Sequence, residues 1–360
     1  MGSKLFFYLF KKKLVYLFVS LLILTVTVQI VDLIELTRSN IGKENFSFER
    51  VIKMSLLKTP FLINEIMPFI IIVSTSFFFK YLVDNNELIS IRNLGLSILN
   101  IFYPVGLAVL TLGILSLIIL NPISSVSMNY YQILDGNNKN SKSTINLDDN
   151  DIWIKNYIED RIIYINSKNM NIENMSLDKV MVIDYNKKNS IVYFAEKAFI
   201  EKEFLKLQNV TETNINLNKN ITHNIKNINI NFIQKDILNS IKYYKYTPFY
   251  KFYNYIKSMK KLNYLNPEII LYFLSEIFKP ILLISIAFVV TGYVSKFNRN
   301  ESFFKTIFIA IIIGFILFLI DRLIYSIDIN NIISYCIVIL TIPILSFVLG
   351  TILIINVEKS

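Results

Sequence analysis

Six long apolar stretches, three on each side of a polar insert, determine what this chain can fold into. Each stretch reaches the ~20 residues that an α-helix needs to cross a ~30 Å hydrocarbon core. Sequences such as PFIIIVSTSFFF and IFIAIIIGFILFLI lack the polar face that a helix in a soluble bundle would show. The sequence therefore predicts a polytopic α-helical membrane protein with spans at Leu14–Leu36, Pro60–Phe79, Leu96–Leu120, Ile269–Val294, Phe304–Tyr325 and Ile332–Ile355.

The polar insert predicts a separate all-β domain. Its segments RIIYINSK, VMVIDYN and IVYFAEKAFI alternate apolar and polar residues, which is the pattern of half-buried strands. Many short strands separated by Asn-rich turns favour a sandwich, jelly roll or barrel. Residues 237–265 instead mix aromatics and lysines at helical spacing, which indicates an amphipathic connector near the lipid headgroups. The expected domains are residues 1–121 with three spans, 122–266 as an external all-β domain with this connector, and 267–360 with three spans.

The composition argues against catalysis. Cys336 is the only cysteine and His223 the only histidine, so neither an intramolecular disulfide nor a zinc site of His and Cys ligands can form. No Walker A, G-x-G-x-x-G or G-x-S-x-G pattern occurs. We expect no cofactor and no metal, and any ATP-driven work requires a nucleotide-binding partner subunit.

The formal charge of +10 favours an anionic membrane surface over nucleic acid, because the basic residues are dispersed over loops and the insert. The positive-inside rule predicts cytoplasmic amino and carboxyl termini and an external insert. One hairpin, residues 37–58, conflicts with this orientation because it places five cations outside: Arg38, Lys43, Arg50, Lys53 and Lys58.

Polar residues in the outer halves of the spans are functional candidates, because charges in a membrane are costly and usually functional. On the first span such residues recur every third position, which we interpret as one polar stripe. A local i,i+3 pair between Glu35 and Arg38 at the helix end is the alternative. The candidates are Gln29, Asp32, Glu35, Arg38, Glu65, Asp321 and Arg322.

The loop at residues 82–97 is a candidate contact for a partner subunit. On a helix, Leu88, Ile91 and Leu94 would form a short apolar face for a groove on the partner. Glu87 and Arg92 would pair with charges at the rim of that groove. An ordinary amphipathic loop is the alternative. Gly95 would allow the sharp exit toward the third span.

In the insert, the apolar strand residues that face inward could line a trough open along one side. The inward candidates are Ile163, Ile165, Val180, Val182, Val192 and Phe194. A closed structural core is the alternative for any apolar strand residue.

Three segments in order resemble the LptF/LptG family of lipopolysaccharide-export permeases. NELISIRNLGLS at residues 86–97 is similar to that family's S-E-L-x-x-x-R-x-x-G-x-S segment. Trp153 in DIWIK is similar to the opening of the family's periplasmic domain, and YIKSMKKLNY resembles its helix before the fourth span. IVDLIEL in the first span, and a sequence that ends in NVEKS soon after the sixth, are more similar to LptG than to LptF.

The resemblance implies a permease subunit of an ATP-driven ABC exporter in the bacterial inner membrane. Its implied partners are two copies of the ATPase LptB, a second permease (LptF or LptG), LptC, LptA-type periplasmic jelly-roll proteins and lipopolysaccharide. The loop at residues 82–97 would then be the coupling helix, and residues 122–266 would be a periplasmic jelly-roll-like domain. The polar residues of the spans would line a lipid cavity, and the apolar trough of the insert would let acyl chains pass while sugars stay in water. LptG relatives often carry lysines on the first span, whereas this chain has Gln29, Asp32 and Glu35. A non-transporting scaffold and a secondary lipid transporter remain alternative functions.

Overall fold

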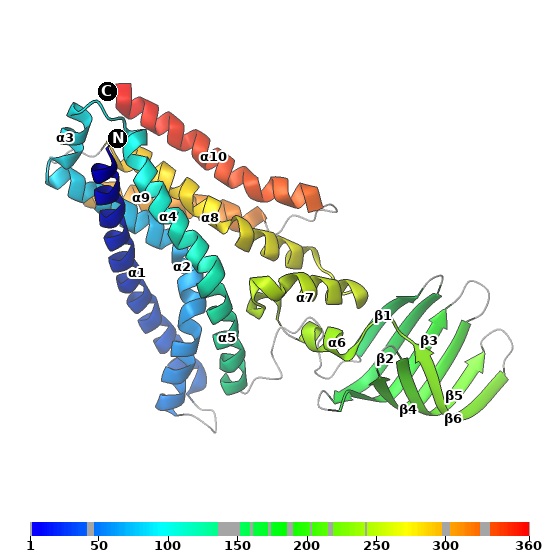
Figure 1. Cartoon of the computed structure of the whole chain (residues 1–360). Coiled ribbons are helices and arrows are strands. Elements are labelled where there is room, and N and C mark those ends of the chain that lie inside the picture. Colours follow the sequence, from blue (N-terminus) through cyan, green and yellow to red (C-terminus); the bar gives the residue numbers. More distant parts are fainter. Residues whose placement is uncertain are drawn as a thin grey trace. The chain divides into compact units, whose positions relative to one another are not determined.

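Two compact units make up the protein, Met1–Leu134 together with Ile270–Ser360, and Asp135–Ile269. A computed structural model describes residues 2–41, 47–135, 152–158, 161–171, 174–185, 190–201, 204–214, 219–241, 243–296, 303–324 and 332–359. The first unit is helical and the second contains all of the described strands (Figure 1). Each unit is described separately below.

Long apolar helices dominate the first unit. The helices α1, α2, α8, α10 and the continuous stretch Ile98–Asp135 are long and apolar enough to cross a membrane, and α9 contains a shorter apolar stretch, Phe304–Ile320. The polytopic helical prediction is therefore confirmed. The elements are α1 (Ser3–Asn40), α2 (Phe48–Asp84), α3 (Glu87–Asn93), α4 (Ile98–Leu115), the π-helical turn η1 (Ser116–Leu120), α5 (Asn121–Asp135), α8 (Pro267–Val294), α9 (Phe303–Ile324) and α10 (Ile332–Lys359).

The helical core lies around α2, while α1 is peripheral. Ile70, Ile71 and Phe79 of α2 are fully buried and pack with residues of α4 and α8. In α1, only 11% of the most apolar window is buried, and Ile23 and Ile34 are at least 60% exposed. Because such side chains avoid water, this face of α1 must contact lipid or another membrane helix.

A close approach joins α4 to α8 just before η1. A Cβ atom added to Gly113 would lie 2.9 Å from Cα of Pro280, so only glycine fits this contact. The π-helical turn follows within three residues, and α5 then starts at Asn121. π-Helical turns shift the register of the helix that continues after them and are frequent at functional sites.

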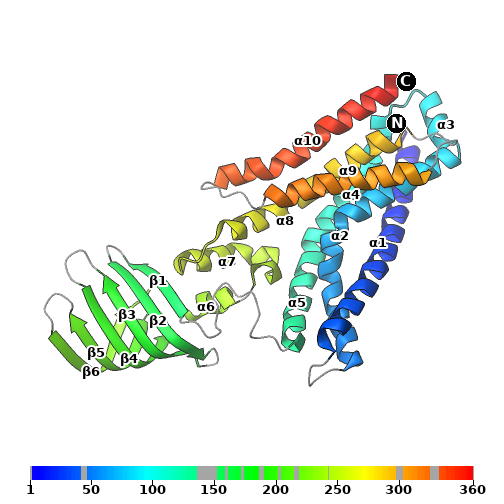
Figure 2. The same cartoon turned by 180° about the vertical axis from the view of Figure 1, so that it is seen from behind.

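The second unit contains one six-stranded antiparallel sheet (Figure 1, Figure 2). Consecutive strands pair with each other throughout, so the connectivity is a meander. The all-β expectation is confirmed, whereas the crossovers of a jelly roll do not occur among the described strands. The strands are β1 (Ile152–Ile158), β2 (Arg161–Asn171), β3 (Ser176–Tyr185), β4 (Ser190–Glu201), β5 (Phe204–Asn214) and β6 (Lys219–Asn229).

Left-handed backbone positions shift which residues face the buried side of the sheet. In β5, Leu207 and Val210 are both buried, although simple alternation would turn them to opposite faces. Asn209 between them has φ +53°, a conformation that Asn tolerates, and this change in backbone direction turns Val210 inward. Lys179 in β3 has φ +52° at the equivalent place. The buried face of the sheet therefore stays apolar on both sides of the point where the inward–outward alternation of residues shifts by one.

The chain that follows β6 returns to β1 and closes one end of the sheet. The side-chain amide of Asn156 in β1 donates to the side-chain oxygen of Asn231, and the Asn231 backbone N–H donates to Asn156 Oδ1 at 3.3 Å. Phe232 is fully buried beside this contact in sequence, and Gln234 Nε2 donates to the carbonyl of Ile200 at 2.6 Å. This end of the sheet is therefore fastened by side-chain amides.

A helical connector follows, with α6 (Gln234–Ile241), the 3₁₀ turn η2 (Tyr244–Tyr246) and α7 (Phe249–Lys261). Asp236 holds it together. Its Oδ1 accepts from Ser258 Oγ at 2.6 Å, and its Oδ2 accepts from the Ile233 backbone N–H at 3.1 Å and lies 3.4 Å from Lys261 Nζ. The carboxylate thus caps the start of α6 and ties it to α7.

Candidate functional site

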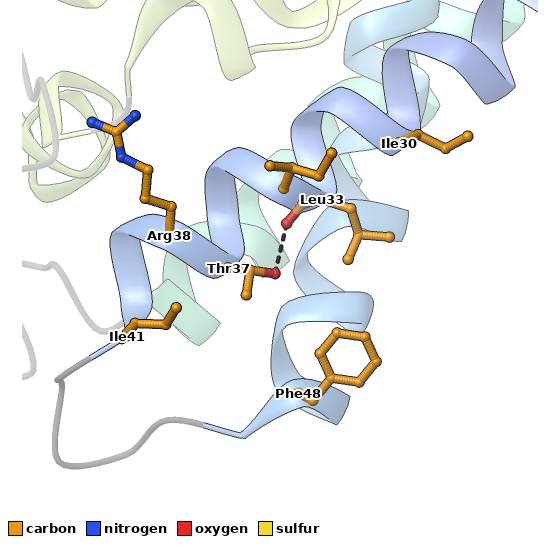
Figure 3. Close-up of a pocket in the computed structure, with 7 residues that line it drawn as sticks. Ile30, Leu33, Thr37, Arg38, Ile41 and Phe48 are labelled. Atoms are coloured by element: carbon orange, nitrogen blue, oxygen red, sulfur yellow. Dashed lines mark hydrogen bonds between the residues drawn. The ribbon is translucent and has the colours of Figure 1, made fainter.

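An apolar pocket lies at the ends of α1 and α2 that face their shared connection (Figure 3). Its volume is about 520 Å³. The Thr37 hydroxyl donates to the Leu33 carbonyl at 2.7 Å, so its polar atom is satisfied within the helix. Arg38 supplies the one charged side chain of the described lining. The lining is apolar, and the Arg38 guanidinium points away from Phe48 (Figure 3), so the pocket itself suits acyl chains, whereas an anionic group would meet Arg38 at its edge. The lining residues are Ile30, Leu33, Ile34, Thr37, Arg38, Ile41 and Phe48.

The expected polar stripe on α1 does not form one face. Asp32 is 4% exposed and accepts a charged hydrogen bond from Lys58 of α2, whereas Glu35 and Arg38 are exposed and Gln29 is half-buried. Three residues turn an α-helix by about 300°, so four residues at this spacing spread over about half of its circumference. The interpretation as one polar stripe was therefore wrong. Asp32 faces α2, whereas Arg38 lies at the pocket.

The cations of the first hairpin are mostly engaged within the chain. Lys58 pairs with Asp32, Lys53 pairs with Glu49 at 2.6 Å, and Arg50 Nε donates to the carbonyl of Leu134 at 3.0 Å. Because these contacts give the cations local roles, their number is a weak guide to orientation. Lys43 lies outside the described residues.

The remaining cavity candidates are distributed over α2 and α9. Glu65 is half-buried on α2. Asp321 and Arg322 belong to α9, but their side chains lie outside the described part of the structure. The structure therefore brings together Asp32 and Lys58, and places Arg38 at the pocket, without joining all seven candidates.

A buried polar cluster between three helices was missed by the sequence analysis. Asn121 Nδ2 of α5 donates to Glu276 Oε2 of α8 at 2.9 Å, and Lys279 Nζ donates to Asn64 Oδ1 of α2 at 2.7 Å. Lys279 Nζ also lies 3.5 Å from Glu276 Oε1, and Asn64 Nδ2 lies 3.4 Å from Glu276 Oε2. The signal was available in SEIFKP, where a Glu and a Lys three residues apart interrupt an apolar span.

The segment after α2 forms the expected helix, but its apolar residues divide between core and surface. Leu88 and Ile91 of α3 are 6% and 5% exposed and pack in the helical core with Phe79 and Leu82. Leu94 is 74% exposed, and Ile89 is 57% exposed. Leu88 and Ile91 thus anchor α3, contrary to the expectation that they form a free face with Leu94. Gly95 has φ +77°, which supports its predicted role in the turn that follows α3.

Two terminal helices hold α3 through its charged residues. Glu87 Oε1 accepts from the Tyr8 hydroxyl of α1 at 2.8 Å, while Glu87 Oε2 is buried without a partner in the described part of the chain. Arg92 lies 3.5 Å from the carbonyl of Val357 in α10, and Glu358 Oε1 accepts from the Ile98 backbone N–H at 3.1 Å. Both views place α3 beside these ends of α1 and α10 (Figure 1, Figure 2).

The strand register separates the six trough candidates into two faces. Ile163, Ile165, Val180 and Val182 are at most 2% exposed. Val182 pairs with Tyr193 of β4, which is 6% exposed and therefore shares its face. Val192 and Phe194 alternate with Tyr193 and point to the opposite face, where Phe194 is 50% exposed. Their predicted inward orientation is wrong, and Tyr193 takes that place. Both sets are apolar, so alternation alone could not fix the phase.

The family model described as "Lipopolysaccharide export system permease LptF/LptG" matches residues 7–356, which is nearly the whole chain. The chain belongs to the LptF/LptG family. No curated protein gave a significant match. As a member of this family, the chain is a permease component of lipopolysaccharide export, is not itself an enzyme and works with other Lpt components. Its apolar helices agree with a multi-pass protein of the inner membrane.

Proposed function

We propose that this LptF/LptG protein is the permease subunit of an ATP-driven ABC exporter that extracts lipopolysaccharide from the outer leaflet of the inner membrane. In this proposal two copies of LptB hydrolyse ATP, a second permease completes the membrane unit, and LptC and LptA-type proteins receive the lipid. The observation that carries the proposal is α3, a short helix anchored in the permease core whose remaining surface is suited to a partner.

The anchoring of α3 makes it suitable for transmitting motion. Because Leu88 and Ile91 pack against α2, a force on α3 moves the core instead of bending a loop. Ile89 and Leu94 offer apolar surface for a groove on LptB. Glu87 Oε2 is buried without a partner in the described part of the chain, which costs roughly 1–3 kcal/mol; a displacement of α3 that exposes this oxygen would let a donor from LptB recover that cost.

The α1–α2 pocket and the buried face of the sheet suggest two successive binding sites for the lipid. At the α1–α2 pocket, acyl chains would pack on Leu33 and Phe48 while Arg38 contacts a phosphate. In the sheet, the buried face that contains Val182 and Tyr193 would take acyl chains during transfer. This route requires cytoplasmic termini, a 3+3 arrangement of spans and a periplasmic sheet, which are parts of the proposal. Between the two paralogues, IVDLIEL in α1 supports an LptG-type subunit.

Affinity purification of the tagged full-length protein from detergent-solubilised membranes tests the proposal. We expect recovery of a nucleotide-binding subunit, a second six-span permease and lipopolysaccharide. In vesicles containing this complex, ATP should drive transfer of lipopolysaccharide to an LptA-type acceptor. Recovery of the chain with phospholipid alone would overturn the ATP-driven assembly and favour a scaffold or a secondary transporter.

A further inference from the structure

The amino-terminal end of α1 is fastened to α3, the helix that we propose as the coupling helix. The Tyr8 hydroxyl donates to Glu87 Oε1 at 2.8 Å and lies 3.3 Å from the hydroxyl of Tyr81 in α2. One turn later, Lys12 Nζ lies 3.9 Å from the centre of the Tyr81 ring, within the range of a cation–π contact. Tyr8 is therefore the point at which α1, α2 and α3 meet through polar atoms.

A second contact fixes the rotation of α1 against α2. Lys13 is fully buried, and its Nζ donates to Ser74 Oγ at 3.0 Å and to Thr75 Oγ1 at 2.8 Å. Both hydroxyls donate in turn to the Ile71 carbonyl. A rotation of α1 would separate the ammonium from these oxygens in an apolar interior, which is costly. This end of α1 therefore has one defined orientation.

The other end of α1 forms a wall of the α1–α2 pocket. α1 runs from Ser3 to Asn40 without a proline or glycine, and at about 1.5 Å per residue it is roughly 57 Å long. Such a helix bends gently but does not kink. Leu33 and Arg38 near its far end line the pocket. A displacement of α3 that reaches α1 is thus carried to the pocket wall.

We propose that Tyr8 is a positioning residue that passes motion of α3 to α1, so that ATP hydrolysis changes the wall of the α1–α2 pocket. This inference rests on the proposed function and adds a second route from α3, beside its packing on α2. The Tyr8–Glu87 hydrogen bond carries the route because it is the direct polar contact between α1 and α3 in the described residues.

The test compares Tyr8→Phe with Tyr16→Phe in the full complex in vesicles. Tyr16 is the matched control, because it also lies beside Tyr81, with the two ring centres 5.9 Å apart. Its hydroxyl has no hydrogen bond in the described part of the chain. The quantity measured is lipopolysaccharide transferred per ATP hydrolysed. A hydrogen bond to a charged group at a partly exposed site predicts about a threefold to tenfold fall for Tyr8→Phe, at unchanged yield of the complex. Tyr16→Phe should keep the wild-type ratio.

The same substitution in a Glu87→Ala background shows whether Tyr8 acts by positioning through Glu87 or by stabilising the protein in general. If Tyr8 acts through Glu87, Tyr8→Phe should cause no further fall in the ratio when Glu87 is already alanine. Equal ratios for Tyr8→Phe and Tyr16→Phe, or an additive fall in the Glu87→Ala background, would overturn the inference while leaving the proposed function intact. If the wild-type complex itself transferred no lipid with ATP, the proposed function would fail, and the inference with it.

Discussion

Asn121 and Glu276 are joined by a hydrogen bond of 2.9 Å inside the apolar helical unit. α5, which starts at Asn121, is the helix from which the chain leaves for the β-sheet, and α8, which carries Glu276, is the helix by which it returns. Together with the close contact of Gly113 on Pro280, this bond holds the outgoing and returning helices at two points. We infer that α5 and α8 move together as one body within the helical unit.

Breaking this cluster should strongly destabilise the protein. Glu276→Ala leaves Lys279 and Asn121 without their carboxylate, and removal of one partner of a buried ion pair costs about 3–5 kcal/mol. Thermal unfolding of the full-length protein in detergent measures the effect. Glu268→Ala is the control, because Glu268 lies exposed in the first turn of the same helix. Equal unfolding temperatures for the two variants would contradict the cluster's structural role. Replacing Glu276 and Lys279 together by Leu and Met should restore most of the stability, since no charge then stays buried without a partner.

The sheet should lose stability as the pH rises, because of Asp184. Burial raises the pKa of this carboxyl above its ordinary value of 3.8, and Arg161 at 3.7 Å opposes the shift only in part. A raised folded-state pKa means that the folded protein binds the proton more tightly, so the stabilisation is present below pH 3.8 and is lost as the pH rises through the folded-state pKa. Asp184→Asn removes the charge and should stabilise the sheet by roughly 1 kcal/mol at neutral pH.

Trp153 makes this measurement possible in the full-length protein. It is the only tryptophan and lies in β1, so its fluorescence reports unfolding of the sheet. We expect the stability difference between Asp184→Asn and wild type to be small at about pH 3.5 and to reach its full size near neutral pH. Asp178→Asn on the same strand controls for the loss of one negative charge. A difference independent of pH would exclude Asp184 as the cause.

The sequence predicted the classes of the elements better than their contacts. Apolar stretches of membrane length and period-two segments follow from local residue types, and both became helices and strands as expected. The partners in the buried cluster could not be deduced, because Asn64 and Glu276 are 212 residues apart. The phase of β4 was also undetermined, since Tyr193 and Phe194 are both apolar and only pairing with β3 separates them. For α3, burial of Leu88 and Ile91 depends on packing with α2, which local periodicity does not contain.

The Asp32–Lys58 pair should be exchangeable. Asp32→Lys places two ammonium groups at the buried contact between α1 and α2 and should cost about 3–5 kcal/mol of stability. The double variant with Asp32→Lys and Lys58→Asp should recover at least half of this loss, which thermal unfolding in detergent measures. The exposed pair Glu49–Lys53 is the control, and its exchange should give a coupling energy below about 1 kcal/mol. No recovery in the double variant would show that the two helices do not depend on this pair.

Removal of the Glu87 carboxylate should lower the affinity of the permease for the ATPase. Glu87→Ala abolishes the unpaired buried oxygen that we propose as an acceptor, and a lost hydrogen bond to a charged group predicts about a tenfold lower affinity. Quantitative co-purification of the ATPase with the tagged permease is the measurement. Asp84→Ala is the control, because Asp84 is a nearby exposed carboxylate that pairs with Lys80 at 2.5 Å. Unchanged ATPase recovery with Glu87→Ala would remove Glu87 from the contact.

Photo-crosslinking can decide whether the buried face of the sheet carries lipid. A crosslinking residue at Val182 replaces a side chain with no exposed area, whereas one at Phe194 lies on the opposite face of the neighbouring strand. If acyl chains slide along the buried face, Val182 should capture lipopolysaccharide in vesicles when ATP is present and not without it. Phe194 is the matched control and should capture none, because alternate strand residues face opposite sides. Capture at neither position would indicate a closed structural core, and capture at Phe194 alone would place the lipid on the other face, so the outcome assigns the path to one face of the sheet.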